Sequence, residues 1–441
     1  MEPVTLPQIL AARDARAARQ QELLRQGKPL LCFTMNIAGP VKTSQLIEQG
    51  FRLGLRRLQG QLLRLKFPVL HRETLFLPTG PEGYFVIDAP ADRIKAMTVD
   101  LEEADELGRL LDLDVIDPSG GKIERKTARN CLICGAPGRN CARSRAHPVE
   151  ALQEKTYAIL NEALRKHQRD LAAELACRAL LYEACTTPKP GLVDRENSGS
   201  HRDMDLFSFL SGAAALTSYF SQCAAIGQET AHLPAEETFR QLRLPGKLAE
   251  GQLFLTTKGV NTHKGAVFLM GVLCGVLGRF STGLVPDSRG MLAEFAAMTR
   301  GITQKELQNS PKITAGERYF ADFSIGGIRW EAENGLPTVK NHGFPTLNTA
   351  LKNGCTLEQA GCHALLAMMV NTEDTALLNR GGMEGWQWVK TRASEILQAG
   401  VTDEALREFD REMTDKNLSP GGSADLLAAC YFLHFLQEET A

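Results

Sequence analysis

The stretch "GRLLDLDV", residues 108–115, predicts a strand and with it an α+β fold for the first part of the chain. Alternate residues of a strand share one face, so Asp112 and Asp114 would lie side by side while the apolar residues between them face the interior. Two neighbouring carboxylates repel each other unless a cation compensates them. Carboxylate pairs suit Mg²⁺, an ion that assists phosphoryl transfer. A solvated polar strand edge, with Arg109 as its neighbour, is the alternative interpretation.

The composition is that of a globular protein with nearly balanced charge. The chain has 441 residues, too many for one core, so we expect two or three domains. The net charge of −2 gives no reason to expect a nucleic-acid partner. The first residues show no secretory signal pattern, and the most apolar segment, residues 265–278, is too short to span a membrane, so we expect no membrane partner. Eleven cysteines in such a chain favour a reducing, cytoplasmic location.

The pattern of apolar residues changes near residue 150. Residues 1–152 combine helical patterns with short strand-like runs that are separated by turn sequences. From residue 153 onward, apolar residues recur at intervals of three and four, which is typical of helices. We therefore expect a multidomain chain with an α+β domain over residues 1–152 and a mainly α-helical domain over residues 153–441.

A cysteine-rich segment follows the two aspartates. Cys131, Cys134 and Cys141 have the spacing C-x2-C-x6-C, and His147 stands six residues further on. Three thiols and an imidazole suit a structural zinc ion, although the usual longer gap between two ligand pairs is missing. Reduced cysteines packed in a small loop are the alternative.

The same region is rich in arginine, whose guanidinium group forms paired hydrogen bonds with phosphate oxygens. We select Arg109, Arg143 and Arg145 as candidate substrate-binding residues. A solvated basic loop would have the same composition, so the spacing does not distinguish the two interpretations.

Three motifs in this half resemble one enzyme family. "CFTMNIAGPVK" (residues 32–42), "ELGRLLDLDV" (106–115) and "CLICGAPGRNCARSRAHPVEAL" (131–152) occur in the order found in the holo-citrate lyase synthases, the apo-citrate lyase phosphoribosyl-dephospho-CoA transferases. The resemblance implies a nucleotidyltransferase-like domain in which Asp112 and Asp114 bind Mg²⁺. It also implies a reaction, in which phosphoribosyl-dephospho-CoA is transferred to a serine of the acyl carrier subunit of citrate lyase and pyrophosphate is released.

In the helical half, polar segments interrupt the apolar pattern where helices are expected to begin. Helix N-termini carry free N–H groups and a positive dipole end, so they favour anions. Each segment alone is as consistent with a helix cap or a solvated turn, but together they suggest one polar cleft that binds a metal ion and a polyphosphate. The candidate catalytic residues are Glu196, Asp203 and Asp205; the candidate magnesium ligands are Asp203, Asp205 and Asp374; the candidate substrate ligands are Arg195, His201, Lys258, Asn261, His263, Lys264, Arg380 and Ser423.

Four of these segments resemble a second family. "KPGLVDRENSGSHRDMD" (residues 189–205), "TKGVNTHKG" (257–265), "NTEDTALLNRGG" (371–382) and "NLSPGGSADLLA" (417–428) match the triphosphoribosyl-dephospho-CoA synthases in order. The resemblance implies that ATP and dephospho-CoA are the substrates and that adenine is released. Residues 321–339 depart from the family pattern, with Trp330 where glycine is expected, so we assign Glu331 no role beyond a guess.

Together the two resemblances predict a bifunctional transferase whose second domain makes what the first consumes. A carboxylate of the helical domain would take the proton of the attacking hydroxyl, and the sequence leaves the choice between Asp203 and Asp205 open. One alternative is a protein-adenylating nucleotidyltransferase fused to a phosphohydrolase. Another is a zinc-dependent scaffold for assembly of the lyase.

Overall fold

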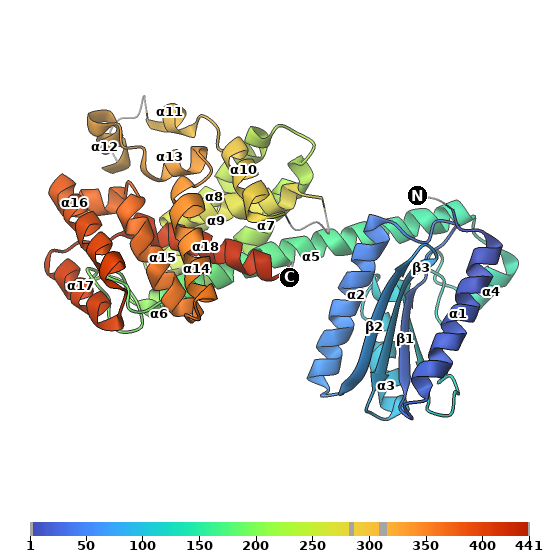
Figure 1. Cartoon of the computed structure of the whole chain (residues 1–441). Coiled ribbons are helices and arrows are strands. Elements are labelled where there is room, and N and C mark those ends of the chain that lie inside the picture. The colour runs from blue at the N-terminus through green and yellow to red at the C-terminus, as the bar shows by residue number, and fades with distance from the viewer. Residues whose placement is uncertain (1–2, 282–285, 308–314, 440–441) are drawn as a thin grey trace. The chain divides into compact units, whose positions relative to one another are not determined.

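The structure is a computed structural model that describes residues 3–281, 286–307 and 315–439. The chain forms two compact units, Met1–Lys166 and His167–Ala441. Helix α5 (Val149–Cys185) runs from the first unit into the second (Figure 1), so the division falls within a helix. The first unit contains a small antiparallel sheet and the second is mostly helical, which confirms the expected multidomain architecture.

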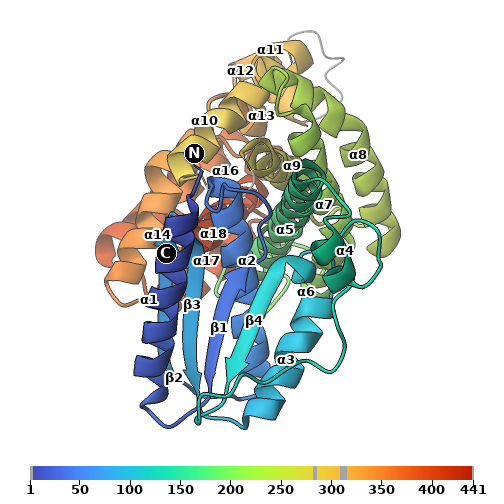
Figure 2. The same ribbon diagram turned by 90° about the vertical axis from the view of Figure 1, so that its right-hand side faces the viewer.

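The first unit is a four-stranded antiparallel sheet with helices on both faces. The strand order is β2-β3-β1-β4, and Figure 2 shows β3, β1 and β4 side by side. The strands are β1 (Leu30–Met35), β2 (Val69–Leu77), β3 (Gly80–Ile87) and β4 (Leu111–Ile116). The helices are α1 (Leu6–Leu24), α2 (Gln45–Arg64), α3 (Ala91–Glu103), the 3-10 turn η1 (Gly108–Leu110) and α4 (Gly138–Ser144).

Successive side chains of a strand point to opposite faces of the sheet, so this unit has a separate apolar core on each face. Leu31 and Phe33 of β1 are buried with α2 and α3 on one face, where the Phe33 ring stacks on Phe51 at 4.3 Å between centroids. Leu30 and Cys32 are buried on the opposite face, together with Leu23 of α1. The period of two in the β1 sequence therefore determines which helix each residue meets.

Strand β4 lies at the edge of the sheet and confirms the strand predicted from "GRLLDLDV". Its outward backbone groups at Leu113 are satisfied by buried side chains of α3, since the amide donates to Glu102 Oε1 at 2.8 Å and the carbonyl accepts from Lys95 Nζ at 3.1 Å. These contacts occupy the edge positions that another strand would otherwise use.

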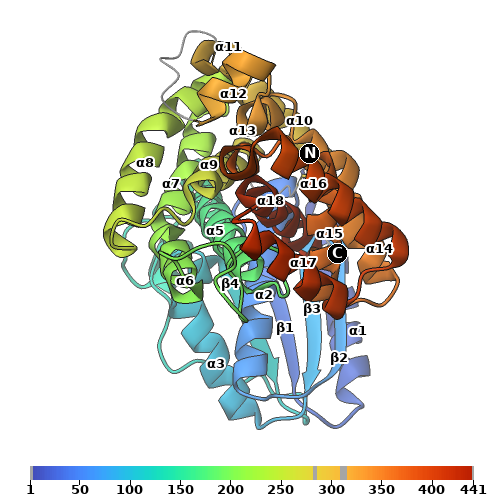
Figure 3. The same ribbon diagram turned by 90° about the vertical axis from the view of Figure 1, so that its left-hand side faces the viewer.

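The second unit is built from helices around α18. Helix α18 packs against α9, α14, α15 and α16 (Figure 3). After α5 the elements are α6 (Leu206–Ala215), α7 (Thr217–Thr230), α8 (Ala235–Thr256), α9 (Lys264–Arg279), α10 (Ser288–Met298), α11 (Ile302–Leu307), α12 (Ala315–Phe323), α13 (Gly327–Glu333), the π-helical turn η2 (Val339–Gly343), α14 (Phe344–Lys352), α15 (Leu357–Asn371), α16 (Thr375–Ala399), α17 (Asp403–Asp415) and α18 (Gly421–Glu438). Within the described ranges, no helix combines the length and the apolar character that a membrane span requires.

Helices α7 and α9 approach each other closely because glycine lines their contact. A Cβ atom on Gly227 would lie 2.1 Å from the Gly275 carbonyl oxygen, and one on Gly278 would lie 2.1 Å from the Ala224 carbonyl oxygen. Both distances are far below van der Waals contact with backbone atoms that cannot move independently. The apolar segment 265–278 is thus a core helix, as expected, and its glycines set its distance from α7.

We predict that Gly278→Ala destabilises the second unit by about 1–3 kcal/mol, because the added methyl group forces α7 and α9 apart. The three tryptophans of the chain all lie in this unit, so their fluorescence during urea unfolding reports on it. Gly251→Ala in α8 is the matched control, since nothing lies within 4 Å of its Cβ position. The control substitution should leave the free energy of unfolding unchanged or raise it by about 0.5–1 kcal/mol. Equal effects of the two substitutions would contradict the close-contact argument.

Candidate active sites

Asp112 and Asp114 project from the same face of β4. Asp112 is paired with Thr34 in the strand register and Asp114 with Cys32. Lys122 Nζ lies 2.7 Å from Asp114 Oδ2 and forms an ion pair with it. The protein therefore supplies a cation to Asp114 itself, whereas the sequence analysis expected a bound metal ion in this role.

Asp112 also lines a cavity of about 440 Å³ in the first unit. Its charged and amide-bearing neighbours in the lining are Arg13, Arg16, Asn36 and Lys42. Lys42 Nζ donates to the Ile37 carbonyl at 2.5 Å, and partial burial lowers the pKa of this lysine. One carboxylate among several cations suits a negatively charged substrate together with a divalent ion.

A buried ion pair holds one of these cations in place. Arg16 NH2 lies 2.6 Å from Glu82 Oε1, and the Glu82 side chain is only 4% exposed. The Tyr84 hydroxyl donates to the other oxygen of Glu82. Burial is the main reason why the pKa of Tyr84 is raised, so this hydroxyl stays protonated. Glu82, which does not line the cavity, thus holds the Arg16 guanidinium in a fixed position at the cavity wall.

The three arginines predicted to bind phosphate do not line this cavity. Arg109 donates to the Asn130 carbonyl and so ties η1 to the cysteine-rich segment. Arg143 and Arg145 lie at the exposed C-terminal end of α4, where Arg145 adopts a left-handed conformation with φ of 49°. Their role in substrate binding stays a prediction.

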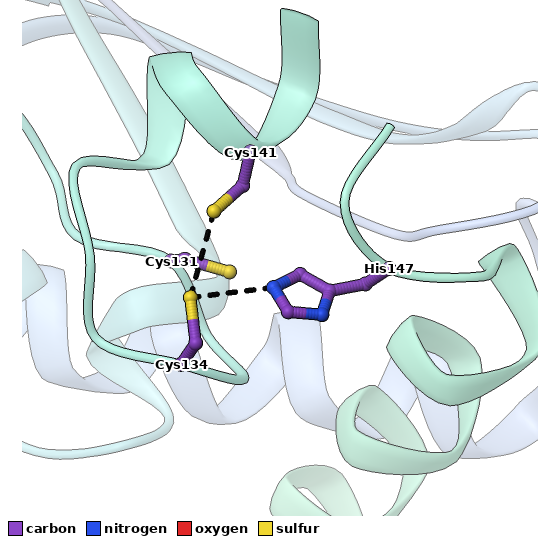
Figure 4. A group of neighbouring side chains, drawn as sticks. All are labelled: Cys131, Cys134, Cys141 and His147. Carbon is purple, nitrogen blue, oxygen red and sulfur yellow. Dashed lines mark hydrogen bonds between the residues drawn. The ribbon is translucent and has the colours of Figure 1, made fainter. Parts of the chain in front are cut away.

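The cysteine-rich segment brings its four predicted ligands together (Figure 4). The Sγ atoms of Cys131, Cys134 and Cys141 and a ring nitrogen of His147 all lie within 4.8 Å of one another. Hydrogen bonds from the Cys134 amide, opposed by some burial, lower the pKa of the Cys131 thiol to about 7. This group could hold a metal ion, as the spacing of the cysteines predicts.

The second unit contains a cavity of about 790 Å³. The N-termini of three helices contribute to its lining: Gly265 and Ala266 of α9, Thr375 and Ala376 of α16, and Gly421 and Gly422 of α18. The positive ends of three helix dipoles therefore converge, and such a place favours polyanions. The lining also carries Lys189, Arg243, Lys247, Arg329 and Arg380 as cations and Glu183, Glu250, Glu306 and Asp425 as acids.

Asp374 joins two of these helix starts. Its carboxylate accepts from the backbone amides of Ala376 and Leu377 in α16 at 3.0 and 3.1 Å. It also accepts from the amide and the hydroxyl of Ser423 in α18 at 2.9 and 3.1 Å. Asp374 and Ser423 are buried and belong to the frame behind the cavity, not to its lining. Four hydrogen bonds therefore occupy the carboxylate of Asp374, which the sequence analysis predicts to be a magnesium ligand.

Asp425 lies at the N-terminus of α9. A Cβ atom on Gly265 would lie 1.9 Å from Asp425 Oδ2, so glycine is required at that position of α9. Burial, followed by the charges of Glu183 and Asp374, raises the pKa of Asp425 well above its ordinary value. Glu183 itself forms a buried ion pair with Lys189 Nζ at 2.6 Å. Two of the acids that line the cavity therefore differ in state: Glu183 is a paired carboxylate, and Asp425 is a carboxyl group that readily holds a proton.

Two histidines of the lining are held in defined orientations. His201 Nε2 lies 2.8 Å from Ser419 Oγ, and its Nδ1 accepts from Arg380 at 3.2 Å. His263 precedes α9 and donates through Nε2 to the Phe209 carbonyl at 2.9 Å. Burial is the main reason why the pKa of both imidazoles is lowered, so both are neutral at physiological pH. With Asn261 and Arg380, which also line the cavity, these are the predicted ligands that the structure brings together.

Other predicted residues of the helical half lie outside the lining. Asp205 caps α6 by accepting from the Ser208 amide at 2.8 Å, and Asp203 is exposed. Glu196 pairs with Arg407 at 2.7 Å. Arg195 pairs with Glu358, and Lys258 is exposed after α8 with φ of 55°. Lys264 is the first residue of α9, and its side chain lies outside the described part of the structure.

The sequence analysis missed the face of α8 that lines the cavity. Arg243, Gly246, Lys247 and Glu250 follow the spacing i, i+3, i+4, i+7, which places them on one face of a helix. The sequence offered this polar stripe as a signal, because it lies beside the buried face of Leu242, Ala249 and Leu253 at helical spacing. Glu183 gave no such signal, since α5 carries other acids such as Glu162 and Glu174 and the sequence does not set Glu183 apart from them.

Two protein-family models match the chain, one for each unit. CitX, described as apo-citrate lyase phosphoribosyl-dephospho-CoA transferase, matches residues 4–163, and CitG, described as ATP:dephospho-CoA triphosphoribosyl transferase, matches residues 169–441. The chain belongs to the CitX and CitG families. The first unit is accordingly the CitX unit, and the second is the CitG unit.

Relatives of known description support this assignment. Protein CitXG of Haemophilus influenzae is 36% identical over 460 residues, which cover 98% of this chain and 96% of that protein. A probable 2-(5''-triphosphoribosyl)-3'-dephosphocoenzyme-A synthase of Citrobacter koseri is 40% identical over 293 residues, 65% of this chain and 95% of that protein. The chain is thus a CitX–CitG fusion, a multifunctional transferase of citrate lyase prosthetic-group biosynthesis, as both resemblances predicted.

We predict that Asp425→Asn makes the CitG unit more stable than the wild type at pH 8. Because the folded protein raises the pKa of Asp425, the folded state binds this proton more tightly than the unfolded chain does. The contribution of Asp425 to stability is therefore present at low pH and is lost as the pH rises from about 4 toward the raised value, by about 1.4 kcal/mol per pH unit. Asparagine cannot ionise and avoids this loss.

Melting temperatures of both proteins between pH 4 and 8 test this expectation. The two should converge near pH 4, and Asp415→Asn, at the exposed end of α17, should follow the wild type throughout. An Asp425→Asn variant that is less stable than the wild type at pH 8 would show that the carboxylate stabilises the fold.

Proposed function

We propose that the chain makes the prosthetic group of citrate lyase and then attaches it. In the CitG unit, ATP and dephospho-CoA would yield triphosphoribosyl-dephospho-CoA and adenine. In the CitX unit, this product would react with a serine of the acyl carrier subunit and release pyrophosphate. The observation that carries the proposal is the CitG cavity, where three helix N-termini suited to a triphosphate meet acidic groups suited to a cationic transition state.

The CitG cavity has the groups that a displacement at ribose needs. The hydroxyl of dephospho-CoA attacks the anomeric carbon of ATP, the bond to adenine breaks, and adenine leaves with a proton. Positive charge develops on the ribose in such a reaction, so nearby negative charge lowers the barrier. Glu250 of the lining would supply this charge, whereas Lys189 balances the charge of Glu183.

We assign the general base to Asp425, which replaces the choice between Asp203 and Asp205. A base must reach the substrate, and Asp425 lines the cavity whereas those two do not. Burial also raises the pKa of Asp425, so its carboxylate takes up a proton more readily than a solvated carboxylate does. Asp425 would take the hydroxyl proton and return it to solvent.

The triphosphate would lie across the starts of α9, α16 and α18. Arg380 is held by the Ser200 carbonyl at 2.9 Å and by Asn417 Oδ1 at 3.0 Å, so its charge is fixed at the cavity wall. The predicted trio Asp203, Asp205 and Asp374 does not converge on one point, and two of its carboxylates are committed to helix caps. We therefore route no step of this reaction through a metal ion held by these three residues.

In the CitX unit we retain the nucleotidyltransferase-like interpretation. Asp112 and Asp114 share one face, and Lys122 is 51% exposed, so a divalent ion can displace it from Asp114. When bound there, Mg²⁺ would withdraw charge from the phosphates. Arg16 and Lys42 would bind the pyrophosphate part of the substrate. The serine hydroxyl would lose its proton as the new P–O bond forms and pyrophosphate leaves.

We place both reactions in the cytoplasm. All eleven cysteines are free thiols in the structure. A reducing compartment keeps such thiols from pairing, and ATP is available there.

We predict that the purified chain releases adenine from ATP only when dephospho-CoA is present, as measured by chromatography. Asp425→Asn should lower this rate by about 10²–10⁴-fold, because the base is lost. Asp415→Asn is the matched control and should keep the wild-type rate. AMP or inorganic phosphate in place of adenine would overturn the proposal and favour the adenylating enzyme fused to a phosphohydrolase.

We predict that Asp112→Asn abolishes modification of the acyl carrier subunit while adenine release stays at the wild-type rate. Mass spectrometry of the carrier and a pyrophosphate assay follow the transfer, and we expect a loss of at least about 100-fold. Asp100→Asn, on the exposed side of α3, is the matched control. Persistence of carrier modification in Asp112→Asn would favour the scaffold interpretation.

A further inference from the structure

The segment between β4 and α5 has few regular elements, and its four ligand side chains are nevertheless close together. Cys134 Sγ lies 3.5 Å from Cys141 Sγ and 3.3 Å from His147 Nε2. Three sulfurs and one nitrogen at zinc-bond lengths around one ion have edges of roughly 3.5–3.8 Å, whereas a disulfide brings two sulfurs to about 2.05 Å. The two separations at Cys134 are close to these edges, and all four ligand atoms lie within 4.8 Å of one another (Figure 4).

We propose that Cys131, Cys134, Cys141 and His147 bind one zinc ion, and that this ion holds Arg129 against the strand that carries Asp112. Three sulfurs and one imidazole nitrogen form a closed coordination sphere, which is typical of structural zinc and leaves no position for a substrate. The zinc therefore acts on the site through the residues of its loop.

The hydrogen bonds of the loop connect the ligand cluster to Arg129. The Cys131 amide donates to the Ala136 carbonyl at 2.6 Å, and the Gly138 amide donates to the Arg129 carbonyl at 2.9 Å. Both bonds close the turn that carries Cys131 and Cys134. A metal ion that fixes this turn consequently fixes the backbone of Arg129.

The Arg129 side chain then reaches the strand edge. Its guanidinium pairs with Glu102, whose side chain is 2% exposed and whose Oε1 also accepts from the Leu113 amide at 2.8 Å. Leu113 stands between Asp112 and Asp114. Arg129 NH2 also lies 3.9 Å from Asp112 Oδ1. A loosened loop would leave Glu102 with a weaker ion pair, to Arg125 at 3.9 Å, and would change the charge around Asp112.

A second connection leads from the loop to the substrate cavity. Leu132, between the first two cysteines, lines the 440 Å³ cavity beside Asp112. It also packs against the apolar cluster that contains Ile159 and Leu160 of α5. The zinc loop thus forms part of the cavity wall, and Arg129 is a positioning residue and not a catalytic one.

Metal analysis of the full-length protein tests the site independently of any activity. The protein is purified under reducing conditions without chelator and offered Zn²⁺. We expect about one zinc per chain in the wild type and in Cys185→Ser, a half-buried thiol of α5 that serves as the control. The double variant Cys134→Ser/Cys141→Ser should bind less than about one fifth of that amount. Co²⁺ bound to the wild type should show the intense visible bands of a tetrahedral thiolate site, which is a readout that needs no variant.

Three results would overturn the zinc site: no zinc in the wild type after Zn²⁺ is offered, a Cys134–Cys141 disulfide in its mass spectrum, or full zinc retention by the double variant. The positioning role rests on the proposed carrier transfer and is measured separately. We expect the double variant to transfer the prosthetic group at least about tenfold more slowly and to release adenine at the wild-type rate. Unchanged transfer in a zinc-free variant that is active for adenine release would overturn the positioning role. If adenine release fails even in the wild type, the proposed function fails and the zinc measurement is unaffected.

Discussion

A buried carboxylate, that of Asp374, joins the beginnings of α16 and α18 through four hydrogen bonds. Both helices leave N–H groups free at their first turns, and a carboxylate is the strongest partner that a side chain offers them. Since one carboxylate serves both helices, their N-termini must face the same space. The start of α9 reaches that space as well, because Gly265 leaves room for Asp425. These contacts bring three helix N-termini to the wall of the CitG cavity.

The same principle, a buried acid that satisfies backbone groups, recurs in the CitX unit. Glu102 accepts from the amide of Leu113 at the free edge of β4 and pairs with Arg129. The edge strand is thereby kept from pairing with other strands, and the two aspartates of β4 keep their orientation. In both units, a buried acid that accepts from backbone amides holds the site together, and a different acid lines the cavity. These second acids are Asp425 and Asp112.

The motifs of the helical half predicted four residues that line the CitG cavity, whereas the predicted carboxylates lie outside its lining. His201, Asn261, His263 and Arg380 all line the cavity. The sequence does not reveal the roles of the carboxylates, because an acidic side chain that caps a helix and one that binds a substrate look alike in a sequence. Asp205 caps α6 and Asp374 caps α16, whereas Glu183 and Asp425 reach the cavity. Only the direction of each side chain distinguishes the two cases.

The sequence by itself determined the two families, the α+β and helical halves, the strand at residues 111–116 and the common face of Asp112 and Asp114. It also predicted the four members of the cysteine and histidine cluster. These features follow from periodicity and from motifs that are continuous in the chain, so local order is enough to reveal them. The tertiary structure alone decided which acids line the cavities, that Lys122 pairs with Asp114, and that Arg129 reaches Asp112 by way of Glu102. Such contacts join residues that are distant in sequence, and their geometry is established only when the helices and the sheet have packed.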